Sequence, residues 1–326
     1  MLGQAIFITG VRKSGTTTLY DSLTALPVFR PGRVKEPQFF VLPDDTVARH
    51  ADWYLGLYDD GAGDIPLDGS TLYYQFPESY ERIRRHIERP FFLCCLRDPA
   101  QRFFSAYWHL RAKPGNVERR SFEEVLASYE KWGGEAEDEI LAQAVRKKKI
   151  DVNYLNQDYL RKHYQAPFDT EVPDPLIFFR YYGESRYSRQ CDALRAQPHH
   201  RVVLFEDLVS HPEQTLHDVL EHLEEVYDLS GVATAEEPPQ LAPNNNRTLN
   251  ANASLLMRTV AKLGWYDYLK RYLGERGKQR VKSLFYGATP RMTREQYDRL
   301  RALLAEEYAF WGKEMPRTLE IWRFRS

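Results

Sequence analysis

The chain has 326 residues, of which 43% are hydrophobic and 28% are charged, as is ordinary for a globular protein. Its 45 lysines and arginines nearly balance its 46 aspartates and glutamates. The chain therefore lacks the overall positive charge that DNA and similar polyanions require, and we expect no nucleic-acid partner.

The cysteine content indicates the redox compartment, and the hydropathy indicates whether a segment could span a membrane. Three cysteines are too few for a disulfide framework, which favours a reducing, cytoplasmic compartment. No segment approaches the ~20 consecutive apolar residues needed to cross a bilayer. We therefore expect no transmembrane segment, so that any membrane contact would be peripheral.

Short apolar segments alternate with helical patterns along the first two thirds of the chain. Ala5 to Thr9 is typical of a buried strand, and Thr16 to Leu26 then has helical spacing. Pro90 to Leu96 (PFFLCCL) indicates a strand that is buried on both faces, and Arg201 to Phe205 indicates a third. An amphipathic helix is predicted from 211 to about 226. This alternation predicts a three-layer α/β/α fold with a central parallel sheet.

The rest of the chain is predicted to be mainly helical. Asp98 and Pro99 have the residue types of a helix cap and first helical residue, and Thr293 and Gln296 are spaced as a capping box. Trp132 to Glu139 (WGGEAEDE) contains glycine and many acidic residues, which is typical of a mobile surface loop. Because no internal repeat is present, we predict one domain that spans residues 1–326.

A glycine-containing loop joins the first predicted strand to the first helix. Gly10 to Thr17 (GVRKSGTT) has two glycines at the spacing of a Walker loop, so that backbone amides and the helix amino terminus can hold a phosphate. In ATP and GTP enzymes a lysine follows the second glycine. Here Lys13 lies inside the loop and Thr16 takes the usual lysine position. The loop therefore predicts a bound phosphate-like group.

This loop resembles that of the sulfotransferases that use 3′-phosphoadenosine 5′-phosphosulfate (PAPS), which commonly reads GxxKxGTT. The resemblance is to the carbohydrate and heparan-type enzymes and their bacterial relatives, and it covers nearly the whole chain. The other matching segments follow in the family's order: Lys35 to Phe40 (KEPQFF); Leu96 to Pro99 (LRDP) with Arg102, Ser105 and Tyr107; Arg201 to Leu208; and a carboxy-terminal pattern that ends near Trp311. It implies one P-loop-like α/β domain.

The resemblance also implies roles for individual residues. Lys13 would stabilise the charge that grows on the leaving phosphate, and Glu36 would be the general base that takes the acceptor proton. The co-product would be adenosine 3′,5′-bisphosphate, and no metal is required. The implied nucleotide contacts are Arg12, Lys13, Ser14, Gly15, Thr16, Thr17 and Thr18 around the 5′-phosphate, Arg97 and Ser105 at the 3′-phosphate, and Arg247 as a closing contact.

Several of these assignments have alternatives. Burial of Glu36 against the two phenylalanines of KEPQFF would raise its pKa, whereas an ion pair with a neighbouring cation would give it a structural role. His109 is a rival base, although a packing role is favoured for it. Lys35 could contact the acceptor or assist Glu36. Arg102 could bind phosphate or form a surface ion pair, and the Arg247 segment could be an ordinary turn.

The acceptor is less well indicated. Asp68 to Tyr74 (DGSTLYY) lies where heparan-type enzymes usually carry Glu-Lys-Thr-Pro, and the missing lysine argues against a strongly anionic polysaccharide. Aromatic residues between Tyr154 and Tyr187 would stack on sugar rings or pack beneath a lid that includes Trp132 to Glu139. We expect a hydroxyl, or less favourably an amine, of a carbohydrate, glycolipid or other small molecule.

Two other functions are compatible with such a loop. A kinase-like phosphotransferase would need the lysine after the second glycine and a magnesium-binding aspartate at a strand end, whereas Asp98 has the position of a helix cap. A catalytically inactive nucleotide-binding protein would have no reason to retain Lys13, Glu36, Arg97 and Ser105 together. Both alternatives are therefore disfavoured.

Overall fold

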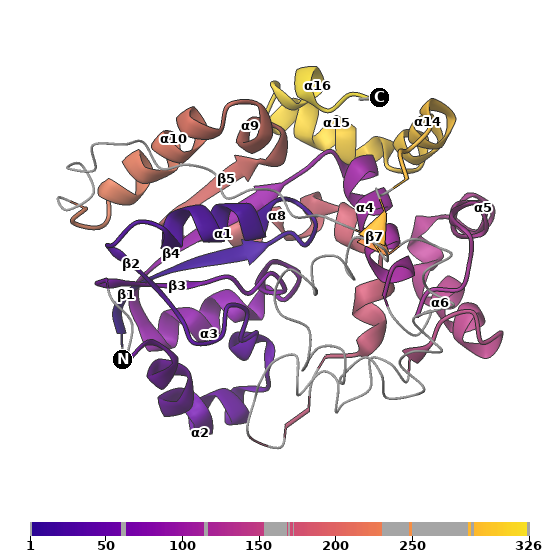
Figure 1. The fold of residues 1–326 in the computed structure, drawn as a ribbon. Helices are drawn as coiled ribbons and strands as arrows, with labels where there is room; N and C mark the ends of the chain where they lie inside the picture. The colour runs from indigo at the N-terminus through magenta and orange to yellow at the C-terminus, as the bar shows by residue number, and fades with distance from the viewer. Residues whose placement is uncertain are drawn as a thin grey trace.

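The computed structural model describes residues 2–59, 63–113, 117–152, 168, 170–171, 173–229, 248–249, 286–287 and 290–324. Its centre is a fully parallel sheet of five strands in the order β2-β3-β1-β4-β5 (Figure 1). The strands are β1 (Leu2–Gly10), β2 (Phe29–Pro31), β3 (Ile65–Asp68), β4 (Ile87–Leu96) and β5 (His200–Leu204). The predicted strands are confirmed as β1, β4 and β5. A short antiparallel pair, β6 (Thr248–Leu249) and β7 (Tyr286–Gly287), lies outside this sheet.

Helices surround the sheet. The α-helices are α1 (Thr16–Thr24), α2 (Asp44–Leu55), α3 (Glu78–His86), α4 (Pro99–Arg111), α5 (Phe122–Trp132), α6 (Glu137–Arg146), α8 (Cys191–Arg195), α9 (Phe205–Ser210), α10 (Pro212–Glu224), α14 (Arg294–Leu303), α15 (Ala305–Glu314) and α16 (Thr318–Ile321). The 3-10 turns are η1 (Phe39–Val41), η2 (Gly56–Tyr58), η3 (Tyr73–Gln75), η4 (Gly134–Ala136), η6 (Pro175–Phe179), η7 (Gly183–Ser185) and η8 (Tyr187–Gln190).

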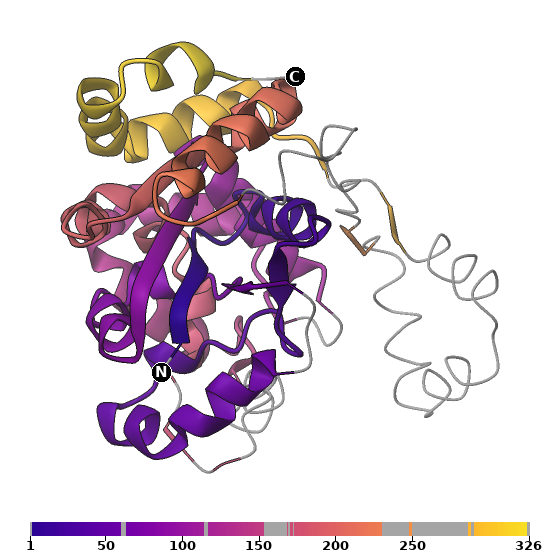
Figure 2. The ribbon, with the colours of Figure 1, turned by 90° about the vertical axis from the view of Figure 1, so that its left-hand side faces the viewer.

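Alternation along the strands produces two apolar layers. Ile6 and Ile8 of β1 pack in one cluster with side chains of α1, α9 and α10, whereas Phe7 points into a larger cluster on the opposite face. That larger cluster contains residues of α2, α3, α4 and the carboxy-terminal helices. Figures 1 and 2 show the same arrangement, with α1 and α10 on one side of the strands and α2 and α3 on the other. The predicted three-layer fold is therefore confirmed.

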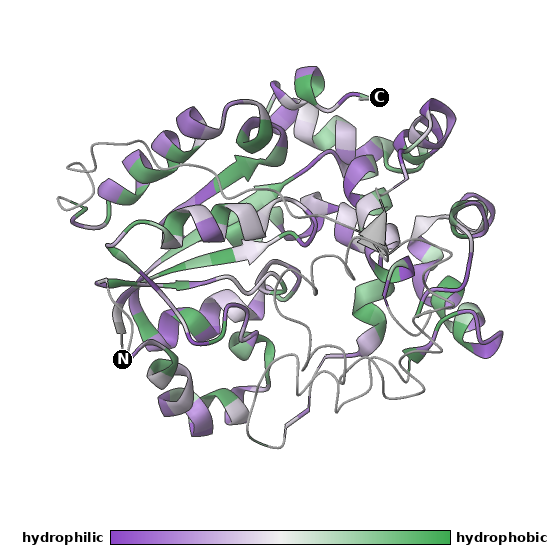
Figure 3. Cartoon of the chain, viewed as in Figure 1, coloured by the Kyte–Doolittle hydropathy of each residue, from purple (hydrophilic) through white to green (hydrophobic). Residues whose placement is uncertain are grey.

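The distribution of hydropathy agrees with this layering. In Figure 3 the central strands are mostly hydrophobic, whereas outer helices such as α10 mix the two colours along their length. The three cysteines are buried and free of disulfides. Within the described ranges, no helix has both the length and the apolar character that a bilayer span requires.

Asp98 joins the end of β4 to the carboxy-terminal helices. It is the N-cap of α4, and Pro99 is the first helical residue, as predicted. Its two carboxylate oxygens also accept hydrogen bonds from the hydroxyls of Tyr308 and Tyr297, each at 2.8 Å. Burial raises the pKa of Asp98, and the hydrogen bonds that it accepts act in the opposite direction. The cap therefore also holds α14 and α15 against α4.

The capping box of α14 is confirmed, but the prediction for Trp132 to Glu139 is wrong. Trp132 ends α5, η4 follows, and α6 begins at Glu137. The Glu137 side chain is buried and accepts hydrogen bonds from the Tyr129 hydroxyl at 2.6 Å and from the backbone amides of Tyr182 and Gly183 at 2.9 Å. One acidic residue of this segment is thus an internal acceptor that fixes α6 to η7, and the segment is not a mobile loop.

A buried carboxylate connects the loop after β1 to α4. Arg102 of α4 is fully buried and donates to Glu184 at 2.6 Å, to the Ser185 hydroxyl at 2.9 Å and to the Tyr181 carbonyl at 2.7 Å. Arg12 donates through Nε to the other carboxylate oxygen of Glu184 at 2.7 Å. Arg102 is therefore neither a surface ion pair nor placed as a phosphate ligand, because its guanidinium is used by protein acceptors.

We predict that Glu184→Gln destabilises the protein by about 3–5 kcal/mol, because the change leaves the buried guanidinium of Arg102 without a counter-charge. Urea unfolding measures this free energy. The matched control is Glu314→Gln, which breaks the more exposed pair with Arg195 and should cost at most about 1 kcal/mol. Equal losses in the two variants would contradict the interpretation.

Candidate functional site

Two glycines shape the loop between β1 and α1. Gly10 has φ 150°, and a Cβ there would lie 2.9 Å from the carbonyl oxygen of Thr71. Gly15, the N-cap of α1, has φ 86°, and a Cβ there would lie 2.7 Å from the Phe205 ring. Both positions therefore require glycine. Because Gly15 has no side chain to cap α1, the first amides of the helix are left for another acceptor.

Lys13 lies in this loop among other cations. Its backbone has φ 71°, a left-handed conformation that side-chain-bearing residues rarely adopt. Burial, together with the charges of Arg97, Lys113 and Arg12, lowers the Lys13 pKa to about 8, whereas Glu36 acts in the opposite direction. Several positive charges thus converge on one point at the carboxyl edge of the sheet. Such a cluster favours an anionic ligand.

Arg97 follows β4 directly and faces the loop. Its guanidinium lies over the ring of Phe205, 4.5 Å from the centroid, and Nη1 donates to the Lys13 carbonyl at 3.2 Å. Burial lowers its pKa. The Arg97 Nε and the Ser14 hydroxyl are buried and have no hydrogen-bond partner among the described residues. Buried donors of this kind are costly unless an acceptor is supplied, so the loop fits a ligand with several oxygens.

The other predicted nucleotide residues are placed as follows. Thr16, Thr17 and Thr18 form the first turn of α1, and Ser105 is a partly buried residue of α4. In the ranges that the structure describes, no hydrogen bond joins Ser105 to Arg97. Arg247 lies outside the described residues.

Arg12 contributes to the loop in a different way. Its guanidinium bonds to Glu184 and to the Ile177 carbonyl, the latter at 3.2 Å, and stacks over the ring of Phe178 at 4.5 Å. The side chain of Arg12 therefore anchors the loop to η6 and η7. Its positive charge still reaches Lys13, whose pKa it lowers.

Glu36 lies between β2 and η1, on the other side of the site. Burial raises the Glu36 pKa, and Asp68 adds to this effect, whereas Lys35, Arg12 and Lys13 oppose it. The carboxylate has no ion pair with any described residue, so nothing in the structure favours the structural ion pair considered above. The direction agrees with the expected effect of burial, and the role of Glu36 as a base stays a prediction.

Lys35 and His109 are the other two residues considered for acceptor contact or proton transfer. Lys35 directs its ammonium group over the ring of Tyr20, 5.0 Å from the centroid. His109 is exposed on α4, and its role as a packing residue or a base stays a prediction.

The sequence did not reveal Lys113, which is the residue that follows α4 by two positions. Burial lowers its pKa, and the charge of Arg12 lowers it further. No carboxylate of the described chain forms an ion pair with it. Lys113 lies about 100 residues from the loop in sequence, and only the direction and length of α4 bring its charge to Lys13.

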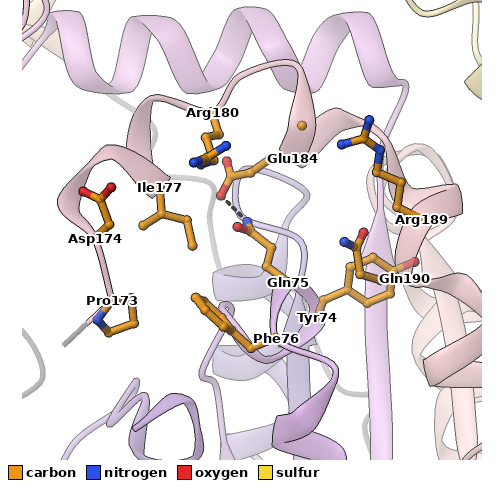
Figure 4. A pocket seen from close by; sticks show the side chains of 11 residues that line it. Tyr74, Gln75, Phe76, Pro173, Asp174, Ile177, Arg180, Glu184, Arg189 and Gln190 are labelled. Atoms are coloured by element: carbon orange, nitrogen blue, oxygen red, sulfur yellow. Dashed lines mark hydrogen bonds between the residues drawn. The ribbon is translucent and has the colours of Figure 1, made fainter. Parts of the chain in front are cut away.

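A pocket of about 360 Å³ with both polar and apolar walls lies between η3 and the turns η6 to η8 (Figure 4). Glu184 and Gln75 face each other in it and are hydrogen-bonded. Glu184 also bonds to Arg12, so the pocket adjoins the loop after β1. The pocket is lined by Tyr74, Gln75, Phe76, Pro173, Asp174, Ile177, Arg180, Gly183, Glu184, Arg189 and Gln190.

Comparisons with known proteins support the fold. No protein-family model matches the chain, and no curated protein matches it in sequence. A solved structure, described as a sulfotransferase from Alicyclobacillus acidocaldarius, is similar with a TM-score of 0.51 and 22% identity over 80% of this chain and 93% of that one. The chain therefore has a sulfotransferase-like α/β fold. In the described residues, no group of histidine, cysteine, aspartate and glutamate side chains could hold a metal ion.

We predict that Lys13 reacts with acetic anhydride as a neutral amine over a lower pH range than an ordinary lysine does. The reactive fraction rises as the proton is lost, so labelling of Lys13 should increase most steeply near pH 8. Short labelling pulses across pH 6 to 11, followed by mass spectrometry of the peptide containing Lys13, measure this titration. The label should be absent from that position in Lys13→Met. A midpoint above pH 10 would contradict the lowering of the Lys13 pKa by burial and by the neighbouring cations.

Proposed function

We propose that this protein transfers a sulfuryl group from PAPS to a hydroxyl of a small or glycan acceptor. The observation that carries the proposal is the convergence of Arg97, Lys113 and Arg12 on Lys13, with the carboxylate of Glu36 near enough to act on the same lysine. The Lys13 ammonium group is suited to stabilise a negatively charged leaving group. The Glu36 carboxylate is suited to accept the proton of the acceptor hydroxyl. The sulfotransferase-like fold supports this assignment.

The residues of the loop would hold the donor. The amides at the start of α1 and the Ser14 hydroxyl suit the 5′-phosphate, and the unpartnered Nε of Arg97 suits a second phosphate, with Ser105 on the adjacent helix. When bound, PAPS supplies a sulfuryl group whose bond to the bridging phosphate oxygen breaks while a bond to the acceptor oxygen forms. Lys13 then stabilises the charge on the departing phosphate.

Glu36 would take the proton of the acceptor hydroxyl. A carboxylate of ordinary acidity is a weak base, and burial makes Glu36 more basic by raising its pKa. Because the carboxylate must be ionised to act, turnover should fall as the pH falls through this raised pKa. The acceptor proton passes to the Glu36 carboxylate and from there to solvent, and adenosine 3′,5′-bisphosphate is the second product.

The kinase alternative is disfavoured by the environment of Asp98. Its oxygens accept the Gln101 amide and the Tyr297 and Tyr308 hydroxyls, so this strand-end carboxylate serves as a helix cap and an anchor. A magnesium-dependent enzyme would need such a carboxylate to face the phosphates. A catalytically inactive nucleotide-binding protein would need neither a Glu36 with a raised pKa nor a Lys13 with a lowered pKa.

We propose a neutral, hydroxyl-bearing acceptor such as a carbohydrate, on the basis of the pocket in Figure 4. Its cations are paired within the protein, Arg180 with Asp138 and Arg189 with Glu135, whereas Asp174 accepts the Leu176 amide and has no ion pair among the described residues. Phe76 and Tyr74 add aromatic surface. A pocket whose arginines are already paired and whose walls are partly aromatic suits a sugar ring better than a polyanion.

Thermal denaturation in the presence of nucleotides tests the proposed donor. Adenosine 3′,5′-bisphosphate at 100 times its Kd should stabilise the protein by about 2.7 kcal/mol, and ATP with Mg²⁺ should have a smaller effect. Arg97→Met should remove most of the bisphosphate effect, whereas Arg195→Met, a surface arginine of α8, should not.

Two results would overturn the proposal. A larger shift with ATP and Mg²⁺ would favour the kinase, and the absence of any shift with either nucleotide would favour a protein without this binding site. A bisphosphate shift that Arg97→Met leaves unchanged would retain the donor but reject the second phosphate site.

A further inference from the structure

Gln38 connects Glu36 to the loop that follows β3. It is 2% exposed and has a left-handed backbone conformation, φ 52°. Its side-chain Oε1 accepts the Leu72 amide at 3.2 Å, and its Nε2 donates to Glu36 Oε2 at 3.4 Å. Its own backbone amide donates to the Ser70 hydroxyl at 2.9 Å. Both ends of the side-chain amide are therefore used.

The orientation of this amide follows from its partners. The Leu72 amide is a donor, so the group facing it must be the oxygen of Gln38. The NH₂ group then has to point to Glu36. A hydrogen bond from an uncharged donor stabilises the ionised form of a carboxylate, which is the form that acts as a base. Gln38 gives the only hydrogen bond that Glu36 accepts within the described residues.

The segment from Ser70 to Leu72, which bonds to Gln38, is held in place by the buried carboxylate of Asp68. Asp68, at the end of β3, accepts the Ser70 amide at 2.8 Å and the hydroxyls of Tyr54 at 2.9 Å and Tyr73 at 3.0 Å. Burial raises the Asp68 pKa to about 6, while the hydrogen bonds from Ser70, Tyr54 and Tyr73 oppose the rise. The Ser70 to Leu72 segment is thereby anchored to α2 and η3, and it provides a rigid support for Gln38.

We propose that Gln38 is a positioning residue that orients Glu36 toward the acceptor and keeps its carboxylate in the ionised form. This inference rests on the proposed function, in which Glu36 is the base. Other charges also act on Glu36, namely Lys35 from its own segment, Asp68 from β3, and Arg12 and Lys13 from the loop after β1. Those groups act through their electric field, whereas Gln38 acts through a directed hydrogen bond.

The inference is tested with Gln38→Met, which keeps the length of the side chain and removes the hydrogen bond. We expect the Glu36 pKa to rise, with an acidity constant lower by about threefold to tenfold, the order expected for one lost hydrogen bond. Carbon-13 NMR of glutamate-labelled protein measures it, and Glu36→Gln identifies the signal. This readout needs no acceptor, and a merely structural role of Gln38 would not change it.

Turnover gives a second readout once an acceptor is known. Gln38→Met should lower kcat by about tenfold with little change in the KM for PAPS, and the acidic limb of the pH profile should move to higher pH. Gln38→Glu, which is isosteric and can still accept the Leu72 amide, should move the limb further because it places a like charge beside Glu36. Gln38→Leu, which likewise removes the NH₂ donor without adding a charge, replaces Gln38→Met if that variant does not fold.

The matched control is Gln214→Leu. Gln214 is exposed on α10 and donates to the Asp218 carboxylate at 2.7 Å, so the change removes a comparable hydrogen bond far from Glu36. It should leave the Glu36 pKa and turnover unchanged. An unaltered Glu36 pKa and an unaltered pH profile in the Gln38 variants would overturn the inference.

Different results would reject the role of Glu36 as a base and the role of Gln38 as a positioning residue. If Glu36→Gln keeps near wild-type turnover, the base assignment is wrong and the role of Gln38 falls with it. If Glu36→Gln is inactive while the Gln38 variants behave as wild type, only the positioning role is rejected.

Discussion

The candidate site depends on the buried carboxylate of Glu184. It binds Arg102 of α4 and Arg12 of the β1–α1 loop at the same time, and so fixes the loop to the helix that follows β4. Without Glu184, the guanidinium of Arg12 would lie close to Lys13 with no carboxylate to neutralise its charge. With it, Arg12 is held to one side, and the partly buried Lys13 and Arg97 are left as the cations that a ligand would meet.

A second constraint brings the Glu36 carboxylate to the same edge of the sheet. Strands β1 and β3 are parallel neighbours, so the loops at their carboxyl ends meet. Gly10 has no side chain because the Thr71 carbonyl lies against it. The loop after β3 therefore contacts the backbone of the β1–α1 loop at Gly10. Through Gln38 it also supports the carboxylate of Glu36. The loop that contains Lys13 and the support of Glu36 thus depend on adjacent strands of one sheet.

The sequence predicts the parts of the fold that local patterns encode. Long apolar runs mark β1, β4 and β5, and the cap at Asp98 follows from its residue type. The strands β2 and β3 were missed because they have only three and four residues, and each contains a proline. The charge pattern of Trp132 to Glu139 was misleading, because whether an acidic residue is solvated or buried depends on what packs against it, here Tyr129 and η7.

The site was predictable to a similar extent. Motif residues such as Lys13 and Glu36 could be named, and the raised Glu36 pKa follows from the burial of its carboxylate. Lys113, Gln38 and Glu184 could not be assigned, because their positions depend on contacts between segments far apart in sequence. The choice of Arg102 as a phosphate ligand or surface residue failed for the same reason.

The most direct test of the central claim is transfer of labelled sulfur from PAPS to neutral glycans, compared between the wild type and Glu36→Gln. The account predicts labelled product and equimolar adenosine 3′,5′-bisphosphate with the wild type. It predicts a loss of at least about 100-fold in Glu36→Gln, which should still bind the bisphosphate. Equal transfer by the two proteins, or release of the bisphosphate without any labelled acceptor, would contradict it.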